Sequence, residues 1–128
     1  MDIRALVKAA QLARQRAHAP YSKYHVGAAI LTADGETYVG CNVENASYGL
    51  TMCAERCAVG AAIAGGAKQI VAIVICTEDG GAPCGACRQV LAEFGDDIRV
   101  ISVNSSGEIV LDTTIATLLP NSFRLTGG

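Results

Sequence analysis

The chain has 128 residues, of which 51% are hydrophobic and 17% charged, and its formal net charge is -2. This length suits one domain with a single core, and basic residues scattered without a Lys/Arg run argue against a polynucleotide partner and for a small substrate. Charged residues in the N-terminal segment and the lack of a long apolar run lead us to expect no signal peptide, no membrane segment and a cytoplasmic location. The low fraction of charged residues also suggests that part of the surface is buried in contacts between subunits.

The N-terminal half of the sequence predicts a helix, a hairpin and a second helix. Apolar side chains at helical spacing indicate a helix over residues 2–18, before Pro20. Two strands within residues 25–41 flank Asp34-Gly35, a strong hairpin signal, and are therefore antiparallel. After a polar loop, alanines and cysteines at helical spacing predict a helix over residues 52–64, which a pair of glycines ends.

The C-terminal half predicts a strand, a helix, a hairpin and a short closing helix. "QIVAIVIC", residues 69–76, has the continuous apolar character of a strand covered on both faces, and Pro83 suits the first turn of a helix that reaches Phe94. This order implies a parallel crossover to residues 99–112, where two strands joined by a link too short for a crossover must form a hairpin. We expect one domain over residues 1–128, an α/β protein with three α/β/α layers and a five-stranded mixed sheet.

Two cysteine-containing segments carry the candidate chemistry. In a reducing compartment, six cysteines are better interpreted as metal ligands, reactive thiols or small core residues than as disulfides. "TMCAERCAVG" places Cys53 at the start of one predicted helix, and "PCGACRQ" places Cys84 and Cys87 at the start of another. Helix N-termini favour thiolates, and three thiolates could bind one Zn²⁺ while leaving a fourth position for a water of lowered pKa.

Two charged residues next to Cys53 can assist such a zinc site. Three thiolates give the site a net negative charge that opposes deprotonation of the water. Arg56 could correct this by hydrogen bonding to the ligand sulfurs without becoming a ligand. Glu55 is then free to take a proton from the water and pass it on.

The order of these motifs resembles that of a known family. "APYSKYHVGAA", "GCNVENASYGLTMCAER", "PCGACRQVLAEF" and "LLPNSF" are similar to the small homotetrameric zinc-dependent cytidine deaminases over essentially the whole chain. The resemblance implies the cytidine-deaminase-like fold and one zinc ion per chain, with Cys53, Cys84 and Cys87 as zinc ligands and Glu55 as the proton carrier. It further implies substrate contacts from Asn42 and Glu44 to the sugar, and from Tyr24, Ala54 and Phe123, the last in a neighbouring subunit's pocket or in its own.

The function that the resemblance implies is hydrolytic deamination of cytidine and 2′-deoxycytidine to the uridines, with release of ammonia, in pyrimidine salvage. A zinc-activated water attacks C4 of the pyrimidine while Glu55 shuttles protons. A free nucleoside is expected rather than a nucleotide, because Glu44 would repel a phosphate. The chain departs from the family pattern at Tyr24, where phenylalanine is usual, at Cys57, where threonine is usual, and in a short loop before Pro83.

Other interpretations stay open at this point. A blasticidin S deaminase has similar motifs but generally lacks the arginine of "CAER", and a base deaminase acting on RNA or DNA conflicts with the net charge and with the expected terminal hairpin. A non-enzymatic zinc module could use Cys57 as a fourth ligand. Glu55 and Arg56 could be solvated, Asn42 and Glu44 turn formers, and Tyr24 and Phe123 core or interface aromatics. We expect Cys41 and Cys76 to be small buried residues, and we assign His18 and His25 no role.

Overall fold

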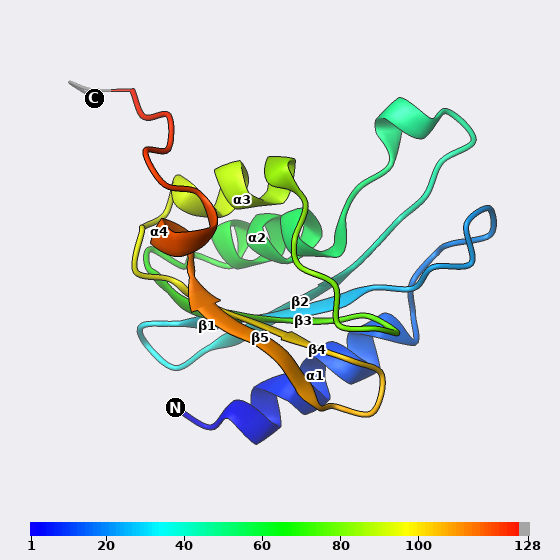
Figure 1. The fold of residues 1–128 in the computed structure, drawn as a ribbon, viewed down its shortest axis with the longest axis horizontal. Helices are drawn as coiled ribbons and strands as arrows, with labels where there is room; N and C mark the ends of the chain where they lie inside the picture. Colours follow the sequence, from blue (N-terminus) through cyan, green and yellow to red (C-terminus); the bar gives the residue numbers. More distant parts are fainter. Residues whose placement is uncertain (126–128) are drawn as a thin grey trace.

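The fold is built on one sheet of five strands in the order β2-β1-β3-β4-β5, and the computed structural model describes residues 1–125 (Figure 1). The strands β3 and β4 are parallel, and every other neighbouring pair is antiparallel. The mixed five-stranded sheet and both predicted hairpins are therefore confirmed. The strands are β1 (Gly27–Thr32), β2 (Thr37–Cys41), β3 (Ile70–Cys76), β4 (Arg99–Val103) and β5 (Ile109–Thr114).

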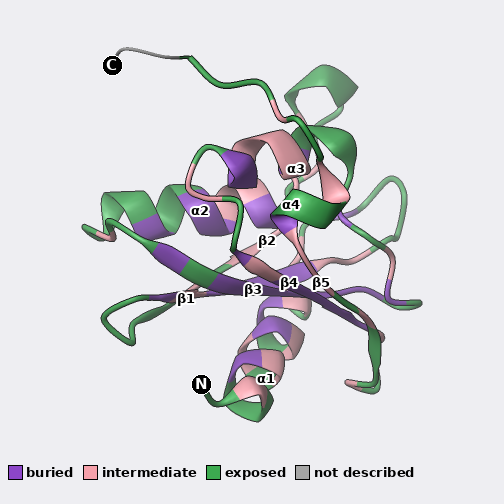
Figure 2. Ribbon diagram, turned by 60° about the vertical axis from the view of Figure 1, so that its left-hand side comes forward, coloured by how far each residue is buried: buried purple, intermediate pink, exposed green. Residues whose placement is uncertain are grey.

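Helices cover both faces of this sheet. One face packs against α1 (Ile3–Arg14), and the other against α2 (Ala54–Ala64), α3 (Gly85–Ala92) and the short α4 (Ile115–Leu118), as Figures 1 and 2 show. A single 3₁₀ turn, η1 (Tyr48–Leu50), lies in the long loop before α2. The three α/β/α layers expected from the sequence are thus present. Among residues 1–125, the helices are too short or too polar to cross a bilayer.

Two apolar cores lie on opposite faces of the sheet because successive strand residues point to opposite sides. On β3, Ile73 and Ile75 belong to the core beneath α2 and α3, whereas Ala72 and Val74 belong to the core beneath α1. Figure 2 shows this buried strand running through the middle of the molecule. A strand that is buried on both faces explains the uninterrupted apolar run in the sequence.

Glycines allow two of the helices to approach the sheet closely. A Cβ on Gly27 would lie 2.1 Å from the Ala10 carbonyl oxygen of α1. A Cβ on Gly40 would lie 2.4 Å from the Ala58 nitrogen of α2. Both distances are too short for a side chain, so β1 and β2 can contact the helix backbones only with glycine at these positions. The contact at Gly40 also fixes the position of α2, whose first residues form part of the candidate site.

The structure corrects some of the predicted boundaries. α1 ends at Arg14 rather than near residue 18, because the chain leaves the helix to place His18 beside Val43 in an isolated bridge. α3 begins at Gly85 with Cys84 as its extended N-cap, so Pro83 lies just before the helix and not in its first turn. Of the two cysteines expected to be small buried residues, Cys76 is buried, but Cys41 is only half-buried.

Candidate active site

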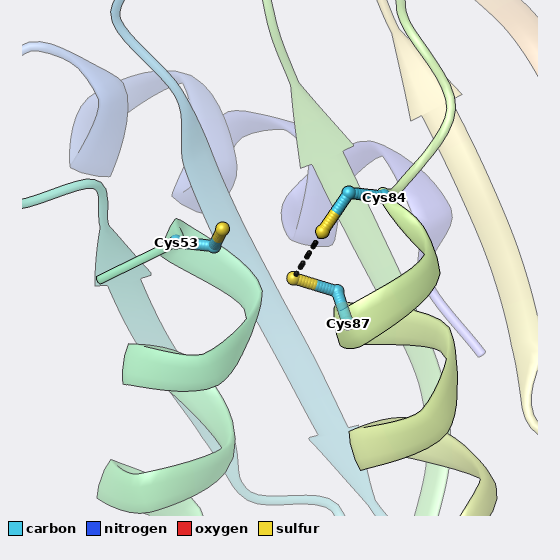
Figure 3. A group of neighbouring side chains, drawn as sticks. All are labelled: Cys53, Cys84 and Cys87. Atoms are coloured by element: carbon cyan, nitrogen blue, oxygen red, sulfur yellow. Dashed lines mark hydrogen bonds between the residues drawn. The ribbon is translucent and has the colours of Figure 1, made fainter. Parts of the chain in front are cut away.

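Three cysteines from two helices form one cluster. The sulfur atoms of Cys53, Cys84 and Cys87 all lie within 4.8 Å of one another, and those of Cys84 and Cys87 are 3.4 Å apart. In Figure 3, the three side chains converge from the beginnings of α2 and α3. The structure thus brings together the three predicted ligands, although Cys53 lies more than thirty residues before the other two in the sequence.

The local structure explains why these sulfurs are available. Cys53 is the N-cap of α2 and Cys84 the N-cap of α3, and neither side chain caps its own helix with a hydrogen bond. Cys87 lies in the first turn of α3 and is fully buried. The free backbone N–H groups at both helix starts create a positive potential, which stabilises thiolates at this point.

The cluster fits a zinc ion. Zinc–sulfur bonds of about 2.3 Å in tetrahedral geometry place ligand sulfurs about 3.8 Å apart, which agrees with the spacing observed. Burial raises the pKa of the Cys87 thiol. Burial also acts to raise the pKa of Cys84, but hydrogen bonds from Cys87, from Cys53 and from the Ala86 backbone together outweigh it and lower that pKa. Metal binding requires all three as thiolates. Among residues 1–125, Cys57 is not part of the cluster.

Arg56 compensates part of the negative charge of the cluster. Its Nη2 donates a hydrogen bond to the Cys53 sulfur at 3.3 Å. Hydrogen bonding to Cys53 is also the main reason why the pKa of Arg56 is raised. Its Nε is buried and has no hydrogen-bond partner within the described part of the chain. A half-buried guanidinium with one buried nitrogen is expected beside an anionic centre, and its hydrogen bond to Cys53 argues against the interpretation of Arg56 as a solvated surface residue.

Glu55 is a buried carboxyl at the same helix start. Only 5% of the residue is exposed, so it is not the solvated first-turn glutamate considered above. Burial raises the pKa of this carboxyl, although hydrogen bonds from its own backbone and from Cys87, together with the charge of Arg56, act in the opposite direction. A carboxyl whose pKa is brought closer to neutrality can both accept and donate a proton during catalysis.

A pocket of about 330 Å³ opens directly over this centre, a volume within the range of small-molecule sites. Cys53, Cys84 and Glu55 line it, so two of the three cysteines and the buried carboxyl face the same space. The predicted substrate contacts that line the pocket as well are Tyr24, Asn42, Glu44 and Ala54. Tyr24 is 42% exposed and therefore forms a wall of the pocket, not part of the core.

Asn42 and Glu44 are held in place by hydrogen bonds within the protein. Asn42 Oδ1 accepts from the Val26 N–H at 2.9 Å, and its Nδ2 donates to the Tyr24 carbonyl at 2.8 Å. The Glu44 carboxylate accepts hydrogen bonds from the Ser22 hydroxyl and from the backbone N–H groups of residues 21 and 22. The Ser22 hydroxyl is the main cause of the lowered pKa of Glu44. Glu44 is thus an oriented anion at the rim of the pocket.

Phe123 lies outside this pocket. Its ring is 69% exposed on the C-terminal segment, which leaves the body of the molecule beyond α4 (Figure 1). Gln89 of α3 donates to the Phe123 carbonyl at 3.1 Å and anchors the segment. Within one chain, the structure therefore does not bring Phe123 together with the other predicted site residues.

Sequence reasoning did not identify Ser22, Thr77 or Asp79, which hold or line the same pocket. The available signal was the place of Thr77 and Asp79 just after β3, because pockets in α/β proteins commonly lie at the carboxyl ends of parallel strands. No local pattern singles out Ser22.

Comparisons with known proteins agree with this site. Residues 1–103 match the family model described as the cytidine and deoxycytidylate deaminase zinc-binding region. A cytidine deaminase of Sporosarcina psychrophila is 46% identical over 96% of this chain and 92% of its own length. One from Halalkalibacterium halodurans is 47% identical over 96% of this chain and 95% of its own length.

The fold agrees with a solved structure of the same kind. The crystal structure of cytidine deaminase from Burkholderia pseudomallei superposes with a TM-score of 0.89 at 46% identity, covering 96% of this chain and all of the other. The zinc-binding character of the matched region agrees with the three converging thiols, so the ion for which this cluster is built is zinc. The chain therefore belongs to the cytidine and deoxycytidylate deaminase family.

Proposed function

We propose that this chain, as one domain over residues 1–128, is a cytidine deaminase. It hydrolyses cytidine and 2′-deoxycytidine to uridine and 2′-deoxyuridine with release of ammonia, the reaction of pyrimidine salvage. The observation that carries this proposal is the buried Glu55 carboxyl close to three converging cysteine sulfurs, with Glu55, Cys53 and Cys84 lining one pocket. The names of the similar cytidine deaminases support the choice of substrate.

Cys53, Cys84 and Cys87 would hold the zinc ion. When bound, zinc supplies a water whose pKa is lowered toward neutrality, which serves as the nucleophile for attack on C4 of the pyrimidine. Three protein ligands leave the coordination position that this water needs. Arg56 stabilises the thiolate of Cys53 through its hydrogen bond and offsets the negative charge of the ligand set.

Glu55 moves the protons. It accepts one proton from the attacking water and passes it to N3 of the base. It then takes the remaining proton from the hydroxyl group added at C4 and delivers it to the amino group, which departs as ammonia while the C4 oxygen becomes the carbonyl of the uridine. Its burial supports this assignment, because a raised pKa lets one carboxyl act first as a base and then as an acid near neutral pH. The amino group would otherwise have to leave as a poor, unprotonated leaving group.

The remaining pocket residues would bind the nucleoside. Asn42 and Glu44 would hydrogen-bond the sugar hydroxyls, and Tyr24 and Ala54 would contact the base. Asn42 uses both polar atoms within the protein, but its Nδ2 carries a second hydrogen that is free to donate. The oriented Glu44 anion favours a nucleoside over a nucleotide, because it would repel a phosphate.

We further propose that the chain forms a homotetramer in which Phe123 completes the pocket of a neighbouring subunit. The exposed ring on an extended C-terminal segment supports this arrangement, because a large aromatic side chain so exposed favours an interface. Low charge and the cysteine chemistry of the site favour a reducing, cytoplasmic location. The net charge of -2 favours a small substrate over a nucleic acid.

The proposal is tested by assaying the zinc-loaded protein on cytidine, 2′-deoxycytidine, cytidine 5′-monophosphate, adenosine and blasticidin S. We expect turnover of the first two nucleosides and ammonia release in equal amounts. Glu55→Gln with wild-type zinc content is the matched inactive control. Turnover of blasticidin S without turnover of cytidine would identify the antibiotic deaminase instead, and zinc binding without turnover of any substrate would favour the structural module.

A further inference from the structure

The loop that follows β3 is a compact turn beside the pocket. The Thr77 hydroxyl oxygen accepts hydrogen bonds from the N–H groups of Gly80 at 2.7 Å and Gly81 at 2.9 Å. The same hydroxyl donates to Asp79 Oδ1 at 3.2 Å. The turn thus satisfies its own polar groups and fixes the direction of the Asp79 carboxylate.

This turn is also attached to the β4–β5 hairpin. Asp79 forms an isolated bridge with Asn104, and the Ser105 N–H donates to the Glu78 carbonyl at 3.3 Å. Gly80 has a φ of +82°, and a Cβ there would lie 2.4 Å from a methyl carbon of Val110. The carboxylate of Asp79 is therefore presented from a support held by the sheet, although it is itself exposed.

Tyr24 reaches this support from a different part of the chain. Its hydroxyl donates to Asp79 Oδ1 at 2.9 Å, joining two segments that are 55 residues apart in the sequence and that both contribute residues to the pocket lining. Its backbone is held as well, because the Tyr24 N–H donates to the Ser22 hydroxyl oxygen at 3.0 Å and Asn42 binds its carbonyl. Both ends of this partly exposed residue are fixed before any ligand arrives.

We propose that Asp79 is a positioning residue, which holds the Tyr24 ring in the orientation that the pocket needs to bind a nucleoside. This inference rests on the deaminase function proposed above. An aromatic side chain that is 42% exposed would otherwise lose rotational freedom when substrate binds, and the Tyr24–Asp79 hydrogen bond removes this cost in advance. Neither residue belongs to the cysteine cluster, so we expect the effect on substrate binding and not on the chemical step.

The test is a double-mutant cycle in steady-state kinetics on cytidine. Tyr24→Phe keeps the ring and removes the donor, and Asp79→Ala removes the acceptor. We expect each to raise KM by about 2- to 12-fold, the range given by one hydrogen bond, while kcat changes by less than about 2-fold. The double variant should be no worse than either single variant, because both remove the same interaction.

Two further variants separate positioning from general loss of structure. Asp79→Asn keeps an acceptor oxygen at the same place, so KM should return to within about 2-fold of wild type. Asp34→Ala is the matched control, since Asp34 also accepts a hydrogen bond from a hydroxyl, that of Thr32, but lies in the β1–β2 turn outside the pocket lining. Its KM should not change.

Several results would overturn the proposal. It is wrong if the wild type turns over cytidine and Asp79→Ala keeps the wild-type KM, or if Tyr24→Phe raises KM equally with and without Asp79. A fall in kcat at unchanged KM would place the effect on the chemical step and also contradict it. Absence of turnover by the wild type itself would overturn the deaminase function and this inference together, which distinguishes the two failures.

Discussion

The Arg56 guanidinium donates a hydrogen bond to the Cys53 sulfur, 3.3 Å away, across the first turn of α2. The same turn carries Glu55 with its side chain buried. A metal ligand, a proton carrier and a charge-compensating residue therefore lie within the four residues 53–56. A helix start makes this possible, because its N-cap and first-turn side chains point to one region while its free N–H groups stabilise negative charge there. The second helix start, at Cys84, completes the cluster.

Replacing Glu55 with glutamine should abolish proton transfer without disturbing the metal site. Glutamine has nearly the same shape but cannot accept a proton, so we expect the rate to fall by about 10² to 10⁴-fold. Zinc content, measured by atomic absorption, and the melting temperature should stay at or above wild-type values, since a buried ionisable group is removed. Activity near that of the wild type would exclude Glu55 as the proton carrier.

Arg56→Gln should change the pH dependence of the reaction. Loss of the guanidinium leaves the three thiolates with less compensation, so deprotonation of the nucleophilic water becomes less favourable and the pH–rate profile should move to higher pH. Arg56→Lys is the matched control, because it keeps the charge but loses the planar set of donors, and its shift should be smaller. An unchanged profile in both variants would show that Arg56 does not tune the site.

The Arg99–Asp112 ion pair joins β4 to β5 through two hydrogen bonds, of 2.9 and 2.7 Å. The hydrogen bond from Arg99 lowers the pKa of Asp112 below its ordinary value of 3.8. A lowered folded-state pKa contributes stability above the ordinary value, and this stability is lost as the pH falls through the folded-state pKa. Asp112→Asn should therefore lower the melting temperature by about 1 to 5 °C at pH 7.

The difference between Asp112→Asn and the wild type should persist down to about pH 5 and shrink below about pH 4. It should also shrink in 1 M NaCl, because both side chains are more than one third exposed and salt screens them. Calorimetric melts at a series of pH values measure both effects. A difference that is independent of pH and salt would mean that the pair does not stabilise the sheet electrostatically.

Phe123→Ala tests whether assembly completes the site. If Phe123 contacts the base in a neighbouring subunit, loss of the ring should raise KM by about 5- to 150-fold, the cost of one base–aromatic stacking contact. Sedimentation of the wild type should show a tetramer. A fully active monomer would contradict the proposed assembly. An unchanged KM in a tetrameric Phe123→Ala variant would contradict the role of Phe123 but not the tetramer.

The features that the sequence predicts are those encoded locally. The Asp34-Gly35 turn and the apolar run of β3 identify the hairpin and the central strand, because turn chemistry and burial act over a few residues. The cysteine ligands are predictable for the same reason, since each lies at a recognisable helix start.

What the sequence could not predict depends on contacts between distant segments. The Tyr24–Asp79 hydrogen bond spans 55 residues, and its acceptor lies in the turn after β3, which is held by a bridge to the β4–β5 hairpin. Ser22 holds Glu44 in the same way, without any motif that would mark it. The position of Pro83 was predicted wrongly because proline suits both the first turn of a helix and the extended residue before its N-cap.

Cys57 distinguishes an open zinc site from a closed structural one. Cys53 and Cys57 are one turn apart on α2, about 6 Å along the helix axis at 1.5 Å per residue, and the Cys57 N–H is bonded to the Cys53 carbonyl at 3.1 Å as in a regular helix. A second zinc–sulfur bond of about 2.3 Å would require this helix start to distort. Burial raises the pKa of the Cys57 thiol, which also disfavours the thiolate form that a ligand needs.

Cys57→Thr should therefore keep one zinc ion per chain and activity within about 2- to 3-fold of wild type, because it removes neither a ligand nor the proton carrier. Cys53→Ala, Cys84→Ala and Cys87→Ala should each lose bound zinc and turnover together. Zinc content and the rate of zinc release to a chelator, measured beside activity for all four variants, separate the two models. If Cys57→Thr released zinc as readily as the other three, Cys57 would be a fourth ligand and the site would leave no position for the catalytic water.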